Sequence, residues 1–185
     1  LEVAEQENRD KKALIIVPPA IKSSWEKTIR LFDKDRNDAI MPYVDFITTG
    51  SIAKLMENDE DEDTTTGVFD TELPHCTYGL ILIDESHNFR NNGTQMYENL
   101  NDLIEEIGLK RGVYPYIGLL SATIQNNCPE DIRNQIYLFQ RKPSESTLAV
   151  EGHNLEHFFA GVCKRYHEII NQHPTGQDEI RANRK

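Results

Sequence analysis

The sequence predicts an α/β protein with three layers, in which helices cover both sides of a mostly parallel sheet. Continuous aliphatic runs, as at residues 13–17 and 78–83, are typical of strands buried on both faces. Segments with apolar residues at helical spacing separate these runs. Strands that alternate with helices along a chain usually form a parallel sheet.

The first expected strand, residues 13–17, ends at Pro18 and Pro19 because proline cannot donate to a sheet ladder. A helix follows, and Ser23 or Ser24 is a plausible cap for its start. The apolar stripe of this helix consists of Ile21, Trp25, Ile29 and Phe32. A second strand at residues 43–47 leads into Thr48, Thr49, Gly50 and Ser51, and Ser51 is a plausible cap for a short helix.

The second half of the chain repeats this alternation. Residues 78–83 and 116–120 predict the third and fourth strands, and a helix at 96–107 that ends near Gly108 separates them. Two further helices are expected at residues 131–139 and 155–170.

One main domain is expected from the length of 185 residues. We expect a lobe at residues 1–143 with an acidic loop, 57–67, inserted in it. A helical extension at 144–172 and a polar, fraying tail at 173–185 would follow. If the apolar stripe of the extension is exposed, the isolated chain should form a homodimer.

Charge and cysteine content exclude several classes of protein. Six acids of residues 57–63 carry much of the net charge of −11, and the basic residues are scattered. Strong DNA binding by this chain alone is therefore not expected. Cys76, Cys128 and Cys163 form no CxxC pair, which argues against a zinc site or a disulfide framework. With no membrane-length apolar run, we expect a cytoplasmic protein, or a nuclear one in a eukaryote.

The most informative segment is the strand at residues 78–83, which runs directly into Asp84 and Glu85. Adjacent carboxylates repel each other, and a divalent cation is the simplest compensation. Asp84 would hold Mg²⁺ through a bound water, and Glu85 would orient or deprotonate a water that attacks a phosphoryl group. The alternative is an acidic pair that opens a surface turn and caps the next helix.

His87 could form a hydrogen bond to the segment that contains Ser121 and Thr123, or it could be an ordinary loop histidine. All the polar segments of interest follow expected strands. Because ligands bind at the carboxyl ends of parallel strands, this coincidence predicts one shared site.

Three motifs together make the chain resemble the first RecA-like lobe of a superfamily two helicase of the Swi/Snf group. Residues 84–87 (DESH) resemble the Walker B or DEAH box, and residues 14–25 resemble motif Ia. Residues 119–126 (LLSATIQN) resemble motif III, and residues 46–54 resemble motif Ib more weakly. The resemblance runs from about residue 1 to residue 139.

The resemblance implies an ATP-dependent translocase of double-stranded DNA. Asp84 would coordinate Mg²⁺ on ATP, and Glu85 would activate the attacking water. His87, Ser121 and Thr123 would couple the nucleotide to the DNA track. The segments with Pro18 and Pro19 and with Thr48, Thr49, Gly50 and Ser51 would face the DNA backbone.

The chain departs from the family pattern in one important respect. It contains no GxxxxGK[ST] phosphate loop, and it ends before a second lobe with an arginine finger. We therefore expect a fragment that lacks the Walker A segment and the second lobe and does not hydrolyse ATP alone. Two alternatives remain: a motor-subunit fragment of a DNA restriction system, or a degenerate lobe that serves as a protein-interaction module.

Overall fold

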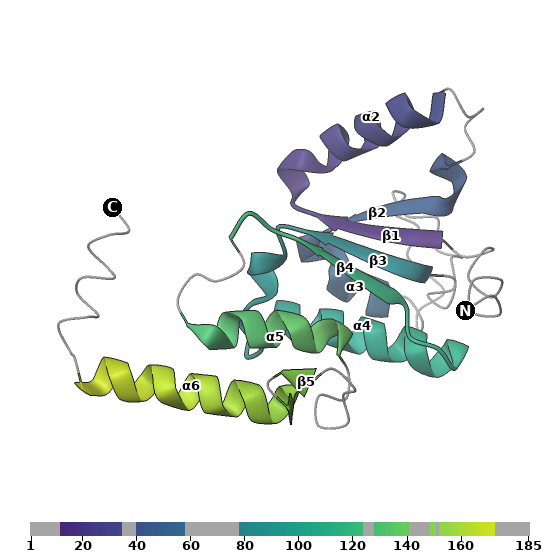
Figure 1. The fold of residues 1–185 in the computed structure, drawn as a ribbon. Helices are drawn as coiled ribbons and strands as arrows, with labels where there is room; N and C mark the ends of the chain where they lie inside the picture. The colour runs from purple at the N-terminus through teal and green to yellow at the C-terminus, as the bar shows by residue number, and fades with distance from the viewer. Residues whose placement is uncertain are drawn as a thin grey trace. The chain divides into compact units, whose positions relative to one another are not determined.

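The computed structural model describes residues 12–34, 40–57, 78–123, 128–140, 149–150 and 152–172 (Figure 1). The expected acidic loop beyond residue 57, the expected tail, Cys76 and residues 144–148 lie outside these ranges. The chain forms two compact units, residues 1–122 and 123–185.

The first unit is built on a four-stranded sheet in which every neighbouring pair is parallel. Its strands are β1 (Lys12–Val17), β2 (Val44–Thr48), β3 (Tyr78–Asp84) and β4 (Tyr116–Leu120), in the order β2-β1-β3-β4. This arrangement confirms the predicted α/β class with a parallel sheet, and it is consistent with a RecA-like fold.

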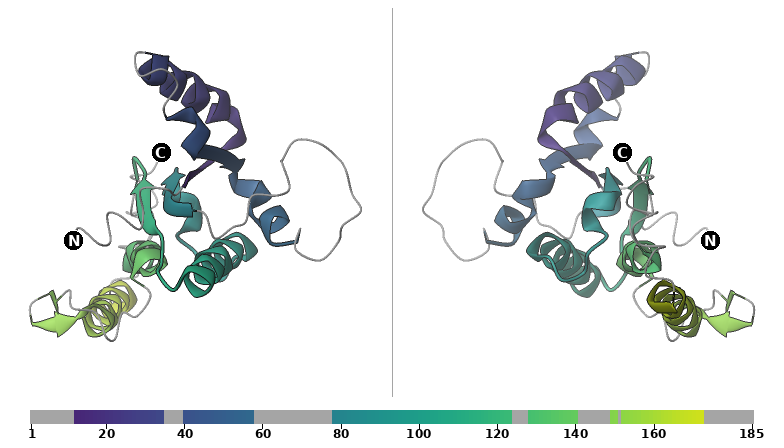
Figure 2. Two further views of the ribbon diagram at one scale, coloured as in Figure 1. Left: turned by 90° about the vertical axis from the view of Figure 1, so that its right-hand side faces the viewer. Right: turned by 90° about the vertical axis from the view of Figure 1, so that its left-hand side faces the viewer.

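Helices cover both faces of this sheet. α2 (Lys22–Asp33) lies on one face, and α4 (Gln95–Arg111) lies on the other beside the short α3 (Ile52–Glu57) (Figures 1 and 2). Four consecutive residues of β1, from Leu14 to Val17, are buried, although successive side chains point to opposite faces. Both faces of β1 are therefore covered, which explains why its sequence is a continuous aliphatic run.

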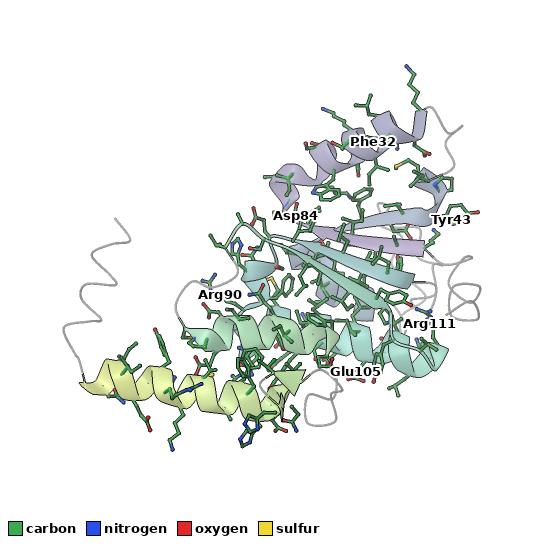
Figure 3. The ribbon with its side chains drawn as sticks, in the orientation of Figure 1. Phe32, Tyr43, Asp84, Arg90, Glu105 and Arg111 are labelled. Atoms are coloured by element: carbon green, nitrogen blue, oxygen red, sulfur yellow. The ribbon has the colours of Figure 1, made fainter. Side chains whose placement is uncertain are left out.

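Trp25 and Ile29 of α2, together with Ile21 just before it, pack against a cluster of β1 and β2 side chains. Phe32 was expected in the same stripe but is 70% exposed. It belongs to the last turn of α2, which lies away from the sheet (Figure 3). Neither Ser23 nor Ser24 caps the helix, because the 3₁₀ turn η1 (Pro19–Ile21) leads directly into it and Ile21 is the capping position.

α4 provides the core of the opposite face. Its buried side chains include Leu100, Leu103, Ile104 and Ile107. The predicted end near Gly108 is wrong, because the helix continues to Arg111 and ends at Gly112. Gly112 has a φ of 70°, the left-handed conformation in which glycine commonly ends a helix.

The second unit contains α5 (Pro129–Phe139), the strand pair β5 (Ala149–Val150) and β6 (His153–Asn154), and α6 (Leu155–Gln172). The rings of Tyr137 and Phe159 meet edge to face, with centroids 6.2 Å apart. Leu155, Phe159 and Cys163 of the α6 stripe are buried, whereas Ile169 near the end of the helix is 60% exposed, so the stripe is core only in its first part. Within the described ranges, no helix combines the length and the apolar character that crossing a membrane requires.

Candidate functional site

The carboxyl ends of all four strands lie at one edge of the sheet because every pair is parallel. Val17 is paired with Thr48, Ile16 with Ile83, and Asp84 with Leu120. The predicted functional segments follow directly: Pro18 after β1, Thr49 after β2, Glu85 after β3 and Ser121 after β4. The strand register thus brings these segments to the same edge, as their sequence positions predicted.

Asp84 is the last residue of β3, and both of its carboxylate oxygens are engaged. The indole Nε1 of Trp25 donates to Oδ2 at 2.7 Å, and the backbone N–H of Glu85 donates to Oδ1 at 2.8 Å. Asp84 is half-buried and lies near the start of α2 (Figure 3). Two donors on different oxygens fix the plane of the carboxylate, which gives this acid a defined orientation.

Glu85 turns the chain sharply. It is the only non-glycine residue in the described part of the chain with positive φ, at φ 53° and ψ 46°. A left-handed conformation costs a non-glycine residue about 1–2 kcal/mol. This turn begins the 3₁₀ segment η6 (Ser86–Phe89) and gives the adjacent Asp84 and Glu85 side chains different partners. Such an outlier at a strand end is a common feature of functional sites.

His87 connects the ends of β3 and β4. Its Nδ1 lies 3.1 Å from Oε2 of Glu85 and 3.2 Å from the hydroxyl Oγ of Ser121. The contact to Ser121 is the bond predicted from sequence, and the contact to Glu85 was not expected. Thr123 falls in the second unit, so a partnership of Thr123 with His87 stays a prediction.

The segments expected to face DNA lie at the same edge as the acids. Pro19 and Gly50 are exposed, and a Cβ on Gly50 would meet nothing within 4 Å. The hydroxyls of Thr48 and Ser51 are 2.7 Å apart and share a hydrogen bond. These segments are therefore accessible, although two of their polar groups bind each other.

Asp84 suits a magnesium ion that is held mainly by water and phosphate. Within the ranges that the structure describes, no three His, Cys, Asp or Glu side chains are arranged to hold a metal ion. Mg²⁺ in phosphoryl-transfer sites commonly needs only one or two carboxylates because waters and phosphate oxygens complete its octahedron. Each Asp84 oxygen keeps a further lone pair beside its present bond, so the carboxylate can still accept a metal-bound water.

A second group of titratable side chains lies in the second unit. Oε1 of Glu130 accepts a hydrogen bond from Nε2 of His167 at 2.9 Å. Burial acts to raise the pKa of Glu130, but hydrogen bonding, in which Cys128, Cys163 and His167 take part, lowers it to about 2. Burial and the nearby Glu130 raise the pKa of Cys128 to about 11. A protonated thiol is neither a good nucleophile nor a metal ligand, so this group is structural.

Trp25 is the site residue that sequence analysis missed, because its helical spacing placed it with the core. The signal for its second role was the indole N–H, which usually finds a hydrogen-bond partner when tryptophan is partly buried. No local pattern indicates which acceptor the indole N–H reaches, since Trp25 and Asp84 are 59 residues apart.

A scan against protein-family models gives no match for this sequence, and a search of curated proteins gives none either. Among solved structures, the chain is similar to a Sulfolobus solfataricus SWI2/SNF2 ATPase core in complex with double-stranded DNA. The two share 19% identity, with a TM-score of 0.45, over 78% of this chain and 28% of the other. The chain thus spans less than a third of the length of that ATPase core.

Proposed function

We propose that this chain carries the hydrolysis and coupling motifs of an ATP-dependent DNA translocase of the Swi/Snf type. The observation that carries the proposal is the separation of two adjacent acids at the end of β3. Asp84 is held by Trp25 and by the backbone, whereas Glu85 turns to His87. Phosphoryl transfer commonly uses a carboxylate that holds the metal and a second group that orients the attacking water, and this arrangement can supply both.

In this proposal Asp84 holds Mg²⁺ through a water ligand. The chemistry that the ion supplies when bound is neutralisation of charge on the transferred phosphoryl group. Glu85 orients the attacking water and accepts its proton. The distance of 3.1 Å between Glu85 and His87 supports a role for His87 in holding the Glu85 carboxylate in place.

The contact between His87 and Ser121 supports a coupling role. It connects the segment after β3 with the segment after β4 at 3.2 Å. A displacement of the Glu85 side chain would therefore be transmitted to the end of β4 through the imidazole ring of His87. The exposed segments at Pro19 and Gly50 share this edge of the sheet, and we propose that they contact the backbone of double-stranded DNA.

We further propose that the chain acts as part of a longer protein. A phosphate loop and a second lobe with an arginine finger would complete the ATP site there. The isolated chain has neither feature in its sequence, so it should show negligible ATP hydrolysis with or without DNA.

The test uses the longer natural protein that contains this sequence, with and without double-stranded DNA. Glu85→Gln should lower DNA-stimulated ATP turnover by about two to four orders of magnitude, because it removes the group that handles the proton. ATP binding, measured with a fluorescent ATP analogue, should be largely unchanged, since the amide keeps the size of the side chain.

Glu98→Gln is the matched control, because Glu98 is an exposed acid on α4 and the substitution is the same. It should leave turnover within about twofold of the wild type. Full ATPase activity in the Glu85→Gln protein would refute the assigned role of Glu85. DNA-stimulated hydrolysis by the isolated chain that is lost in Glu85→Gln would refute the need for a longer protein.

A further inference from the structure

We infer that Trp25 is a positioning residue for the metal-binding carboxylate of Asp84, in addition to its place in the core. This inference rests on the proposed function, because it assigns a task to Trp25 within the same magnesium site. The juxtaposition that carries it is the 2.7 Å hydrogen bond from Trp25 Nε1 to Asp84 Oδ2.

The bond has the length expected of a charge-assisted interaction. Hydrogen bonds from N–H groups to neutral oxygens are commonly 2.9–3.0 Å long, and bonds to ionised acceptors are shorter. Packing alone would leave the indole N–H free to take a backbone carbonyl or a water. Its partner is instead the acid at the end of β3, so the contact joins α2 to the candidate metal site.

The two donors on Asp84 act together. The Glu85 N–H holds Oδ1 at 2.8 Å and the indole holds Oδ2. With one bond on each oxygen, the carboxylate cannot rotate about its terminal torsion without breaking one of them. A metal-bound water therefore meets lone pairs that already point in fixed directions, and ordering the carboxylate costs little free energy on binding.

Removing the indole N–H should weaken metal binding without removing the ligand. Loss of a hydrogen-bond partner behind a metal ligand commonly weakens metal affinity by 10- to 100-fold. The Glu85 N–H remains in a Trp25→Phe protein, so we expect the lower end, about tenfold. Phenylalanine keeps a ring against Ile15 and Val17, and the packing of α2 should survive.

The chain suits a spectroscopic test because Trp25 is its only tryptophan. The indole N–H therefore gives a single resonance in a ¹H–¹⁵N spectrum of the chain. Mn²⁺ is the probe, since it replaces Mg²⁺ at oxygen sites and broadens signals of nearby nuclei. Signals are followed during Mn²⁺ titration of the wild type, Asp84→Asn, Trp25→Phe and the control Asp102→Asn, a change at an exposed acid on α4.

In the wild type and Asp102→Asn, the indole signal and the backbone amide signals of Asp84 and Glu85 should broaden as Mn²⁺ is added, and excess Mg²⁺ should reverse this. Asp84→Asn should shift the indole signal and abolish this site-specific broadening. Trp25→Phe should raise the apparent Mn²⁺ dissociation constant, read from the two amide signals, by about tenfold. Its spectrum should otherwise keep the dispersion of the folded wild type.

The outcomes separate the two proposals. Equal or tighter Mn²⁺ binding in folded Trp25→Phe would overturn the positioning role and leave the metal site of the proposed function intact. An indole signal that is unmoved in Asp84→Asn would overturn the hydrogen bond itself. Absence of broadening at Asp84 and Glu85 in the wild type would overturn the metal site, and the role of Trp25 with it.

Discussion

Gly108 offers a sharp test of how α4 packs, because its missing side chain leaves room for a tyrosine ring. The helix continues through Gly108 to Arg111, and Tyr114 folds back over it. A Cβ on Gly108 would overlap two carbons of the Tyr114 ring. Gly108→Ala must therefore displace the ring or bend the helix.

Two opposing terms determine the effect on stability. Alanine is favoured over glycine in a helix by about 1 kcal/mol. Against this, a displaced Tyr114 loses its hydrogen bond to Glu105, which is 2.7 Å long, at a cost of about 1 kcal/mol. It also loses the ring contacts of a side chain that is only 44% exposed, at about 1–2 kcal/mol. We expect Gly108→Ala to lower the free energy of unfolding by about 1–2 kcal/mol.

A double-mutant cycle isolates the ring as the cause. In a Tyr114→Ala background the obstacle is gone, so Gly108→Ala should stabilise the chain by about 0.5–1 kcal/mol. Gly161→Ala in α6 is the matched control, because its Cβ would meet nothing within 4 Å. It should raise the free energy of unfolding by about 0.5–1 kcal/mol in either background.

Urea unfolding followed by circular dichroism measures all four corners of the cycle. A change of 1 kcal/mol corresponds to about 2–4 °C in Tm for a chain of this size, which a thermal scan would resolve. If Gly108→Ala is equally destabilising with and without the Tyr114 ring, the packing explanation is wrong. The glycine would then be required by the helix backbone itself.

Two further predictions concern acidic side chains. Asp33 is fully buried, and its two carboxylate oxygens accept hydrogen bonds from the backbone N–H groups of Ile40 and Met41, each at 2.8 Å. Asp33→Asn leaves one carbonyl oxygen for two donors. It should lower the free energy of unfolding, measured in urea, by about 1.5–3 kcal/mol. The pKa of Glu130 is lowered to about 2, so its contribution to stability is fully present above its ordinary pKa of 4.5 and is lost as the pH falls toward 2. Between pH 6 and pH 2.5, the free energy of unfolding from urea titrations should therefore fall by about 1–2 kcal/mol less in Glu130→Gln than in the wild type, and parallel curves would contradict this role.

The strands were the most predictable elements. The prediction of residues 116–120 coincides with β4, and the other three strands agree within one residue at each end. Their aliphatic runs are bounded by proline or polar residues, so burial and strand ends leave a local signature. The pair β5 and β6 was missed because strands of two residues are too short to show a period.

The sequence predicted that the site residues lie at one edge of the sheet, but it did not predict every side chain that they contact there. Parallel strands bring their carboxyl ends together whatever the side chains are, so Asp84 and Ser121 had to share an edge. The bond from Trp25 to Asp84 depends on the angle at which α2 crosses the sheet, and no local pattern encodes that angle. The same applies to the end of α2, where Phe32 follows the helical period and is nevertheless exposed.

The backbone of Glu85 provides the strongest argument that the acidic pair serves a purpose other than stability. A glycine at this position would adopt φ 53° without strain, and the adjacent carboxylates would no longer repel each other. Glutamate instead incurs about 1–2 kcal/mol of strain. The Glu85 side chain contacts His87 but is 41% exposed, and exposed ion pairs contribute only about 0–1 kcal/mol to stability. The contact does not offset the strain, so the position of the second carboxylate, rather than the stability of the turn, is what this residue provides.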